Sequence, residues 1–244
     1  MPHLELYFYV LLFVVAFLYA SVGHGGASGY LALMAIFGIS PLFMKPTALL
    51  LNLFVSFSAF VFFYRGGHFK WKYFLPFALA SIPMSFLGGM ISLDANLYKK
   101  ILGVLLMIPI TRLVLFPNNE KEEMNDLNTP TAMLIGGVIG FLSGLIGIGG
   151  GIILSPLLLL LRWTDQKQTA AISAMFILVN SLAGLGGQLT KGIEFQPEML
   201  TFVGIAFVGG SVGAWFGAIK FNQQVLKYLL ALVLLMASLK LLLS

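Results

Sequence analysis

Residues 143–156 read Ser-Gly-Leu-Ile-Gly-Ile-Gly-Gly-Gly-Ile-Ile-Leu-Ser-Pro, a glycine run between two apolar segments. Glycine costs about 1 kcal/mol relative to alanine inside a helix, so three consecutive glycines at 149–151 prevent a helix from continuing. They also free the backbone to take positive φ and to expose its N–H groups. Irregular backbone survives at membrane depth only where it is buried in protein or lines a wet cavity. The run therefore predicts a loop that faces a site.

The same pattern occurs earlier in the chain. Gly-x-Gly-Gly begins at Gly23 and again at Gly147, 124 residues later, each time after an apolar segment and before a short one. Two broken helices at matching places in two halves are typical of a transporter binding site. An internal duplication is the simplest interpretation. We therefore divide the chain into a first transmembrane repeat (1–116), a polar linker loop (117–130) and a second transmembrane repeat (131–244).

The composition excludes most soluble classes. Of all residues, 59% are hydrophobic and 9% are charged, and the mean hydropathy is +0.97. Such a chain cannot cover a water-facing surface, which predicts an all-α integral membrane protein. Without cysteine, and with three histidines far apart in sequence, it offers little support for disulfides, a metal or another cofactor. The net charge is +5, but the lysines and arginines lie in short loops, where they orient a membrane protein. The charge therefore does not indicate nucleic-acid binding.

Eight apolar segments approach the 20 residues that a bilayer crossing needs. They lie at 5–22, 47–64, 73–93, 97–116, 131–147, 169–190, 198–219 and 224–243. Two shorter apolar pieces, 28–40 and 150–161, follow the glycine loops and are too short to cross a ~30 Å hydrocarbon core unaided. We expect eight full transmembrane helices and two short broken helices.

The relation between the repeats depends on whether the short pieces cross the membrane. If they re-enter, each half has four crossings, and seven of the 14 lysines and arginines lie on each side of the membrane. If they cross, each half has five crossings, the repeats are inverted and the division is nine to five. The positive-inside rule favours the uneven division. We therefore expect two inverted repeats with both termini on the non-cytoplasmic side.

The glycine loops are the main candidate site. Backbone N–H groups at the N-terminus of a short helix, together with the helix dipole, attract an anion without a charged side chain. Neither loop contains lysine or arginine, so the anion would be held weakly enough to leave. The alternative is that glycine only permits close helix packing, as we expect for residues 209–213. The candidate loop residues are Gly23, His24, Gly25, Gly26, Gly147, Gly149, Gly150 and Gly151.

Polar residues of the helices that follow are further candidates. They are Thr47, Asn52, Ser173, Asn180 and Ser181. Neutral donors can hydrogen-bond an oxyanion in a low-dielectric cavity without a permanent charge that would trap it. We expect one anion site, shared by both loops and flanked by Asn52 and Asn180. Interhelical hydrogen bonding is the competing interpretation, and His24 is either a proton carrier or a structural histidine.

An enzymatic pattern also has to be considered. Gly26-Ala27-Ser28-Gly29 matches the Gly-x-Ser-Gly pattern around the nucleophile of rhomboid-like serine proteases of the membrane. Such a serine needs a histidine base from another membrane helix. His68 is expected in a loop, and the second repeat carries Ile152 in place of Ser28. We therefore do not expect an enzyme, although a membrane-embedded enzyme or scaffold remains the alternative from a different class.

Residues 147–158 and 170–184 closely resemble the second repeat of the sulfite exporter TauE/SafE family, also called the toluene sulfonate uptake permease family. The resemblance covers nearly the whole chain. It implies an inner-membrane permease for small anions such as sulfite, sulfoacetate and other organosulfonates, usually moved outward. It also implies that the loop glycines, Thr47, Ser173, Asn180 and Ser181 are motif positions, whereas Ala27 and Ala32 depart from the pattern. The expected partners are a small anionic substrate and the lipid bilayer. A homodimer and a carrier for another small solute are left open.

Overall fold

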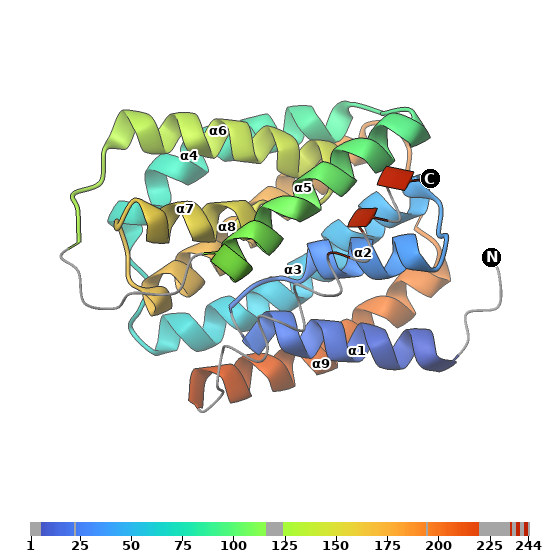
Figure 1. Ribbon diagram of the computed structural model, residues 1–244, viewed down its shortest axis with the longest axis horizontal. Helices are drawn as coiled ribbons and strands as arrows, with labels where there is room; N and C mark the ends of the chain where they lie inside the picture. The colour runs from blue at the N-terminus through green and yellow to red at the C-terminus, as the bar shows by residue number, and fades with distance from the viewer. Residues whose placement is uncertain are drawn as a thin grey trace.

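The computed structural model describes residues 6–21, 23–115, 124–193 and 195–219, together with Leu235, Ser238, Leu239, Leu242 and Leu243. These residues form helices and connecting turns, with no strand among them (Figure 1). The helices are α1 (Leu6–Ser21), α2 (Ala27–Ile36), α3 (Pro41–Arg65), α4 (Trp71–Met90), α5 (Ala95–Leu115), α6 (Thr129–Ile146), α7 (Gly151–Leu160), α8 (Gln166–Leu189) and α9 (Pro197–Ile219). The expected span at 224–243 lies outside the described residues apart from those five.

Five helices of the described chain are long and apolar enough to cross a membrane. They are α3, α4, α6, α8 and α9. The expected span at 5–22 is shorter than a full crossing, because α1 has only 16 residues. The helix ends at Ser21, just before Gly23, which takes a left-handed φ of 77°. The expectation of eight full crossings therefore exceeds what the described residues show.

The glycine loops break the chain where the sequence predicts. Gly26 has a φ of 92° directly before α2, and Gly150 has a φ of 76° directly before α7. Residues with a Cβ rarely adopt such angles, whereas glycine does so at little cost. Each short helix has ten residues and so extends about 15 Å, half the thickness of a hydrocarbon core.

The helices after the short pieces begin earlier than expected. α3 starts at residue 41 and not at 47, because Pro41 suits a first helical position, where its missing N–H is not needed. The preceding short helix ends at Ile36, and Gly38 follows with a φ of 70°. α8 starts at 166 and not at 169, because the Asp165 side chain accepts a 2.8 Å hydrogen bond from a first-turn N–H.

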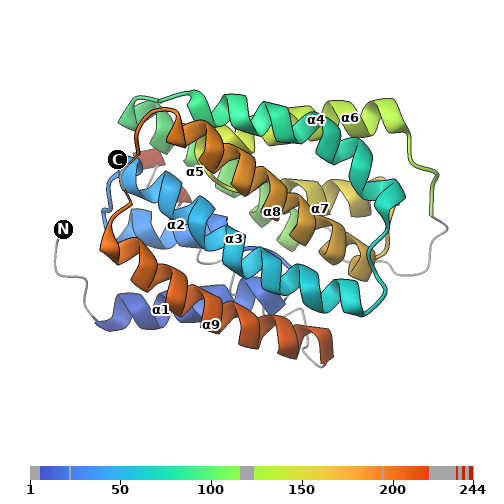
Figure 2. The ribbon, with the colours of Figure 1, turned by 180° about the vertical axis from the view of Figure 1, so that it is seen from behind.

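α3 and α8 form the centre of the molecule. They run antiparallel, since Leu49 packs near Gly184 while Asn52, further along α3, bonds to Ser181, further back on α8. α4 and α6 cover one side of this pair, and α1 and α9 cover the other (Figures 1 and 2). Consecutive helices from α1 to α9 alternate in direction, so each short helix runs back toward the end at which the preceding helix began (Figure 1).

Glycines let the outer helices touch backbone to backbone. α6 carries a glycine every fourth residue on the face toward α4, and a Cβ at any of them would collide with an α4 carbonyl oxygen. These residues are Gly136, Gly140 and Gly144. Gly209 and Gly213 of α9 approach the carbonyl oxygens of α1 in the same way, and Gly210 packs on Val55 of α3. The expectation that residues 209–213 serve close packing is confirmed.

Candidate functional site

The two glycine loops meet at one pair of side chains. Asn52 of α3 and Ile177 of α8 both lie against Gly25 of the first loop and Gly149 of the second. A Cβ placed on Gly25 would lie 2.7 Å from Asn52 Oδ1 and 2.8 Å from Ile177 Cγ2. A Cβ on Gly149 would lie 2.9 Å from the same methyl group and 3.2 Å from Ser181 Oγ. We call Gly25, Gly149, Asn52, Ile177 and Ser181 the central site.

Asn52 is fully buried and only partly hydrogen-bonded. Its Nδ2 donates to Ser181 Oγ at 3.2 Å, and its Oδ1 has no partner among the described residues. An unpaired buried polar atom costs about 1 to 3 kcal/mol, so its presence needs an explanation. If the amide turned by half a revolution, Ser181 could donate to Oδ1 and the NH₂ group would be free. The pair could thus offer a donor to an anion and keep its own bond.

Two helix N-termini lie next to this site, since Gly25 and Gly149 directly precede the cap residues of α2 and α7. Neither Gly26 before α2 nor Gly150 before α7 provides a side-chain cap for the first N–H groups of its helix. A helix leaves its first N–H groups without an intrahelical partner, and an anion is a natural substitute for a cap. The residues around both junctions are buried, so water cannot freely satisfy these groups. The geometry is therefore suited to holding a small anion with backbone donors.

The remaining loop residues contact the surrounding helices. Gly23 lies against Ala170 at the start of α8, and Gly147 lies against Lys45 at the start of α3. Gly150 faces the side chains of Ile139 and Phe176, and Gly151 lies against Ile177. The His24 side chain is half-buried, and its backbone N–H donates to the Tyr19 carbonyl at 2.9 Å.

Three of the predicted side chains are directed elsewhere. Thr47 Oγ1 donates to the Phe43 carbonyl one turn earlier, and Ser173 Oγ bonds to Ser155 Oγ at 2.7 Å. Asn180 Nδ2 donates to Ser81 Oγ of α4 at 3.0 Å and to the Phe176 carbonyl at 2.8 Å. Successive helical residues point about 100° apart, so Asn180 faces α4 while its neighbour Ser181 faces Asn52. In the structure, Ser181 and not Asn180 is the α8 side chain that bonds to Asn52.

Sequence reasoning missed two residues near the loops. Ile177 gave no signal, because an apolar residue in an apolar helix is unremarkable in sequence. Tyr30 of α2 is fully buried, its hydroxyl has no partner among the described residues, and a Cβ on Gly26 would lie 2.6 Å from that oxygen. A tyrosine one turn after a glycine loop could have been noticed, since a buried phenol normally finds a hydrogen-bond partner.

The serine of the protease-like pattern has a structural role. Ser28 is 2% exposed, and its hydroxyl donates to the phenol oxygen of Tyr19 at 2.9 Å. A nucleophilic serine instead donates to a basic group that can take its proton. The described residues also contain no group of three or more metal-binding side chains.

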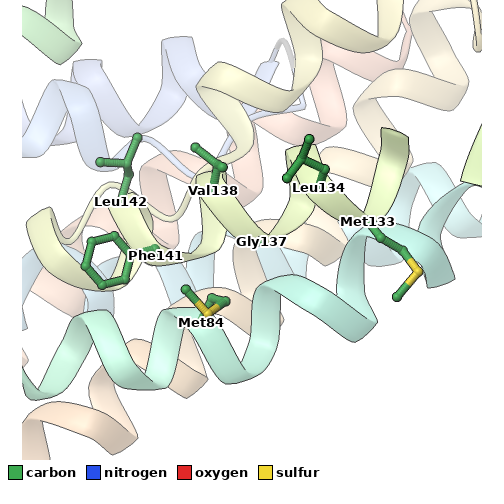
Figure 3. Close-up of a pocket in the computed structure, with 7 residues that line it drawn as sticks. All are labelled: Met84, Met133, Leu134, Gly137, Val138, Phe141 and Leu142. Atoms are coloured by element: carbon green, nitrogen blue, oxygen red, sulfur yellow. The ribbon is translucent and has the colours of Figure 1, made fainter. Parts of the chain in front are cut away.

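A groove on the outer surface of α4 and α6 is separate from the central site. It has a volume of about 390 Å³ and is lined by apolar groups that include Met84, Leu134 and Val138 (Figure 3). Leu134 is 70% exposed and Val138 is 55% exposed. Exposed apolar side chains on a candidate membrane helix belong on a surface that faces lipid tails. We do not assign the groove to substrate.

The proteins to which the chain is similar include probable membrane transporters. The model of the family described as sulfite exporter TauE/SafE matches residues 8–241. The chain is 39% identical over 235 residues to a probable membrane transporter of Sinorhizobium fredii, covering 94% of this chain and 95% of that protein. It is 28% identical over 204 residues to a probable membrane transporter of Methanocaldococcus jannaschii, covering 79% and 75%. It is 34% identical over 101 residues to sulfite exporter TauE/SafE family protein 1 of Arabidopsis thaliana, covering 39% and 22%. No solved structure matches the chain.

Proposed function

Because the chain belongs to the sulfite exporter TauE/SafE family of membrane transporters, we propose that it carries small sulfur oxyanions across the membrane by alternating access. The chain is a multi-pass membrane protein and a transporter, not an enzyme. The proposed substrates are sulfite, sulfoacetate or another organosulfonate. The observation that carries the proposal is that both glycine loops, each leading into an uncapped helix N-terminus, contact Asn52, which bonds to Ser181.

The chemistry of the central site fits an oxyanion. A sulfonate or sulfite group offers three oxygens that accept hydrogen bonds and none that must donate. Backbone N–H groups, the Asn52 amide and the Ser181 hydroxyl are neutral donors that could meet these oxygens. In a low-dielectric interior a fixed positive charge would bind the anion too tightly to release it. Neutral donors therefore bind the anion weakly enough for it to be released during transport.

The packing of the helices supports two inverted repeats. The first helix of each half packs on the fourth helix of the other half, α1 on α9 and α6 on α4. The third helices, α3 and α8, pack on each other, and matching helices of the two halves run in opposite directions (Figure 1). Exchanging the halves leaves this pattern unchanged, as for repeats related by a two-fold axis in the membrane plane. Such repeats can expose a shared site alternately to the two sides of the membrane.

Flux measurements on the purified protein in proteoliposomes test this function. We expect saturable uptake of labelled sulfite and of an organosulfonate, and no uptake of acetate or of a divalent metal ion. Protein-free liposomes and the Asn52→Leu variant serve as controls. Uptake of acetate or metal without uptake of either sulfur oxyanion would overturn the proposal in favour of a carrier for another solute.

A further inference from the structure

The central site has one polar wall and one apolar wall. Asn52 Oδ1 and Nδ2 face Gly25 and Gly149, and the Ile177 Cγ2 methyl group lies near the same two glycines. Ile177 is 3% exposed, and its remaining side-chain carbons pack on Gly151, the first residue of α7. A β-branched side chain in a helix has one strongly preferred χ1 rotamer, so this methyl group is held in place. Both loops therefore touch a fixed apolar surface as well as a polar one.

Asn52 and Ile177 occupy matching places in the two halves. Gly23 and Gly147 are matching glycines of the two loops. Gly23 contacts Ala170 of α8 and Gly147 contacts Lys45 of α3, so the matching contact residues of the two helices are 125 positions apart (170 − 45). The same separation relates Ile177 to Asn52 (177 − 52), and each of them contacts both loops. One half thus contributes an amide to the centre, and the other half contributes a hydrocarbon branch. A ligand that is polar on all sides would not use this difference.

We propose that Ile177 is the specificity-determining residue of the central site and that it favours organosulfonates over sulfite. The inference rests on the proposed function, because it concerns the choice among sulfur oxyanions. An organosulfonate has three oxygens on one side of sulfur and carbon on the other. Its oxygens would meet Asn52, Ser181 and the loop N–H groups, and its carbon would lie on the Ile177 methyl group. Sulfite has no carbon to place there, so it gains nothing from that apolar contact.

Substitutions at Ile177 distinguish the effect of the apolar wall from that of the polar wall. Ile177→Asn gives the centre a second amide and removes the apolar surface. Ile177→Ala removes the methyl branch without adding a polar group, and it decides the question if the asparagine variant does not fold. Ile177→Val keeps a β-branched methyl group and should keep the selectivity. Ile172→Val, at a fully buried position on the same helix, controls for general changes in packing of α8.

The measured quantity is the ratio of kcat/KM for ethanesulfonate to kcat/KM for sulfite in proteoliposomes. We expect a ratio above one for the unmodified protein, and a fall of roughly tenfold or more in Ile177→Asn and Ile177→Ala, since apolar pockets discriminate single carbon groups by about 10- to 200-fold. The ratio should change less than about twofold in Ile177→Val and Ile172→Val. An unchanged ratio in Ile177→Ala, and in Ile177→Asn if that variant folds, with both anions still carried, would overturn this inference alone. If the unmodified protein carried neither anion, the proposed function would fail with it.

Discussion

Asn52 is the side chain on which the two halves of the chain meet. Replacing it by leucine keeps a similar volume but removes the amide that faces both loops. Loss of one donor from a buried polar site costs about 1 to 3 kcal/mol, so Asn52→Leu should weaken substrate binding by roughly 5- to 150-fold. A binding titration with sulfite and an organosulfonate on the purified variant measures this change.

Asn180→Leu is the matched comparison for this prediction. Asn180 bonds to Ser81 and to the Phe176 carbonyl, so its loss should lower the stability of the α4–α8 contact more than it lowers affinity. The sequence alone assigned both asparagines the same role. Equal losses of affinity in the two variants would contradict a purely structural role for Asn180 at the α4–α8 contact.

Gly149 is required for both its backbone angle and its lack of a side chain. It has a φ of 74°, and a Cβ there would collide with Asn52 and Ile177. We expect Gly149→Val to abolish transport while the protein still inserts and purifies, because the strained backbone angle lies in a loop and not within a long helix.

Gly38→Val separates the two effects at Gly149. Gly38 has a similar φ of 70°, but a Cβ there would have nothing within 4 Å. Gly38→Val should strain the backbone as Gly149→Val does, but it should leave the central site intact. We therefore expect Gly38→Val to retain transport. Flux assays on both variants, with size-exclusion profiles to check folding, decide the point. Full transport by Gly149→Val would mean that this loop serves only packing.

At the level of elements, the α4–α6 contact depends on the glycines of α6. Gly140 faces the backbone of Ser81, and an added Cβ would meet the carbonyl oxygen too closely for any side-chain rearrangement to relieve. Gly140→Ala should therefore destabilise the protein by about 1 to 3 kcal/mol, the usual cost of overpacking. Thermal unfolding in detergent measures the loss.

Gly137→Ala is the control on the same helix. A Cβ at Gly137 would meet only the side chains of Ala80 and Met84, both at 3.8 Å, which is ordinary contact. Because alanine is a better helix former than glycine by about 1 kcal/mol, this variant should be neutral or slightly more stable. Equal destabilisation by both substitutions would show that the glycines matter for helix flexibility and not for close approach.

For the whole molecule, the positions of the charged residues bear on the topology. Lys45 donates to the carbonyls of Gly89 and Ile91 at the end of α4, and Lys191 donates to Ser92 just beyond. These two lysines therefore lie at one end of the bundle. If the short pieces re-entered the membrane, which gives the seven-to-seven division, Lys45 and Lys191 would lie on opposite sides. If the short pieces cross, which gives the nine-to-five division, the two lysines lie on the same side.

The second end of the bundle gives the same result. Lys72 pairs with Asp126 at 3.9 Å, and the neighbouring Asn125 bonds to the carbonyls of Leu161 and Arg162. Lys72 and Arg162 thus share an end, as the nine-to-five division requires. By the positive-inside rule we expect that end to be cytoplasmic.

This assignment predicts the location of the C-terminus. Alkaline phosphatase fused after Ser244 should be active and a fluorescent protein fused there should be dark, because both would lie outside the cytoplasm. The same reporters inserted in the polar linker at 117–123 should give the opposite result. An active phosphatase in the linker together with an inactive one at Ser244 would reverse the proposed orientation.

The sequence by itself determined the membrane class, the two breaks and the short helices after them. These are local properties: hydropathy depends on composition, and a glycine run ends a helix whatever surrounds it. Gly26 and Gly150 take positive φ as the sequence predicts. The sequence does not predict the start of α3, because the apolar pattern does not distinguish the first turn of a helix at Pro41 from the loop before it.

Only the tertiary structure decided which side chains lie together between the two loops. Asn52 and Ser181 are 129 residues apart, and their contact depends on how α3 and α8 are rotated against each other. One residue along a helix turns the side chain by about 100°, so Asn180 and Ser181 face different neighbours although they are adjacent in sequence. Ile177 is likewise a candidate only because the structure places it against Gly25 and Gly149. Its chemistry is ordinary, and only its position between two loops distinguishes it from other buried isoleucines.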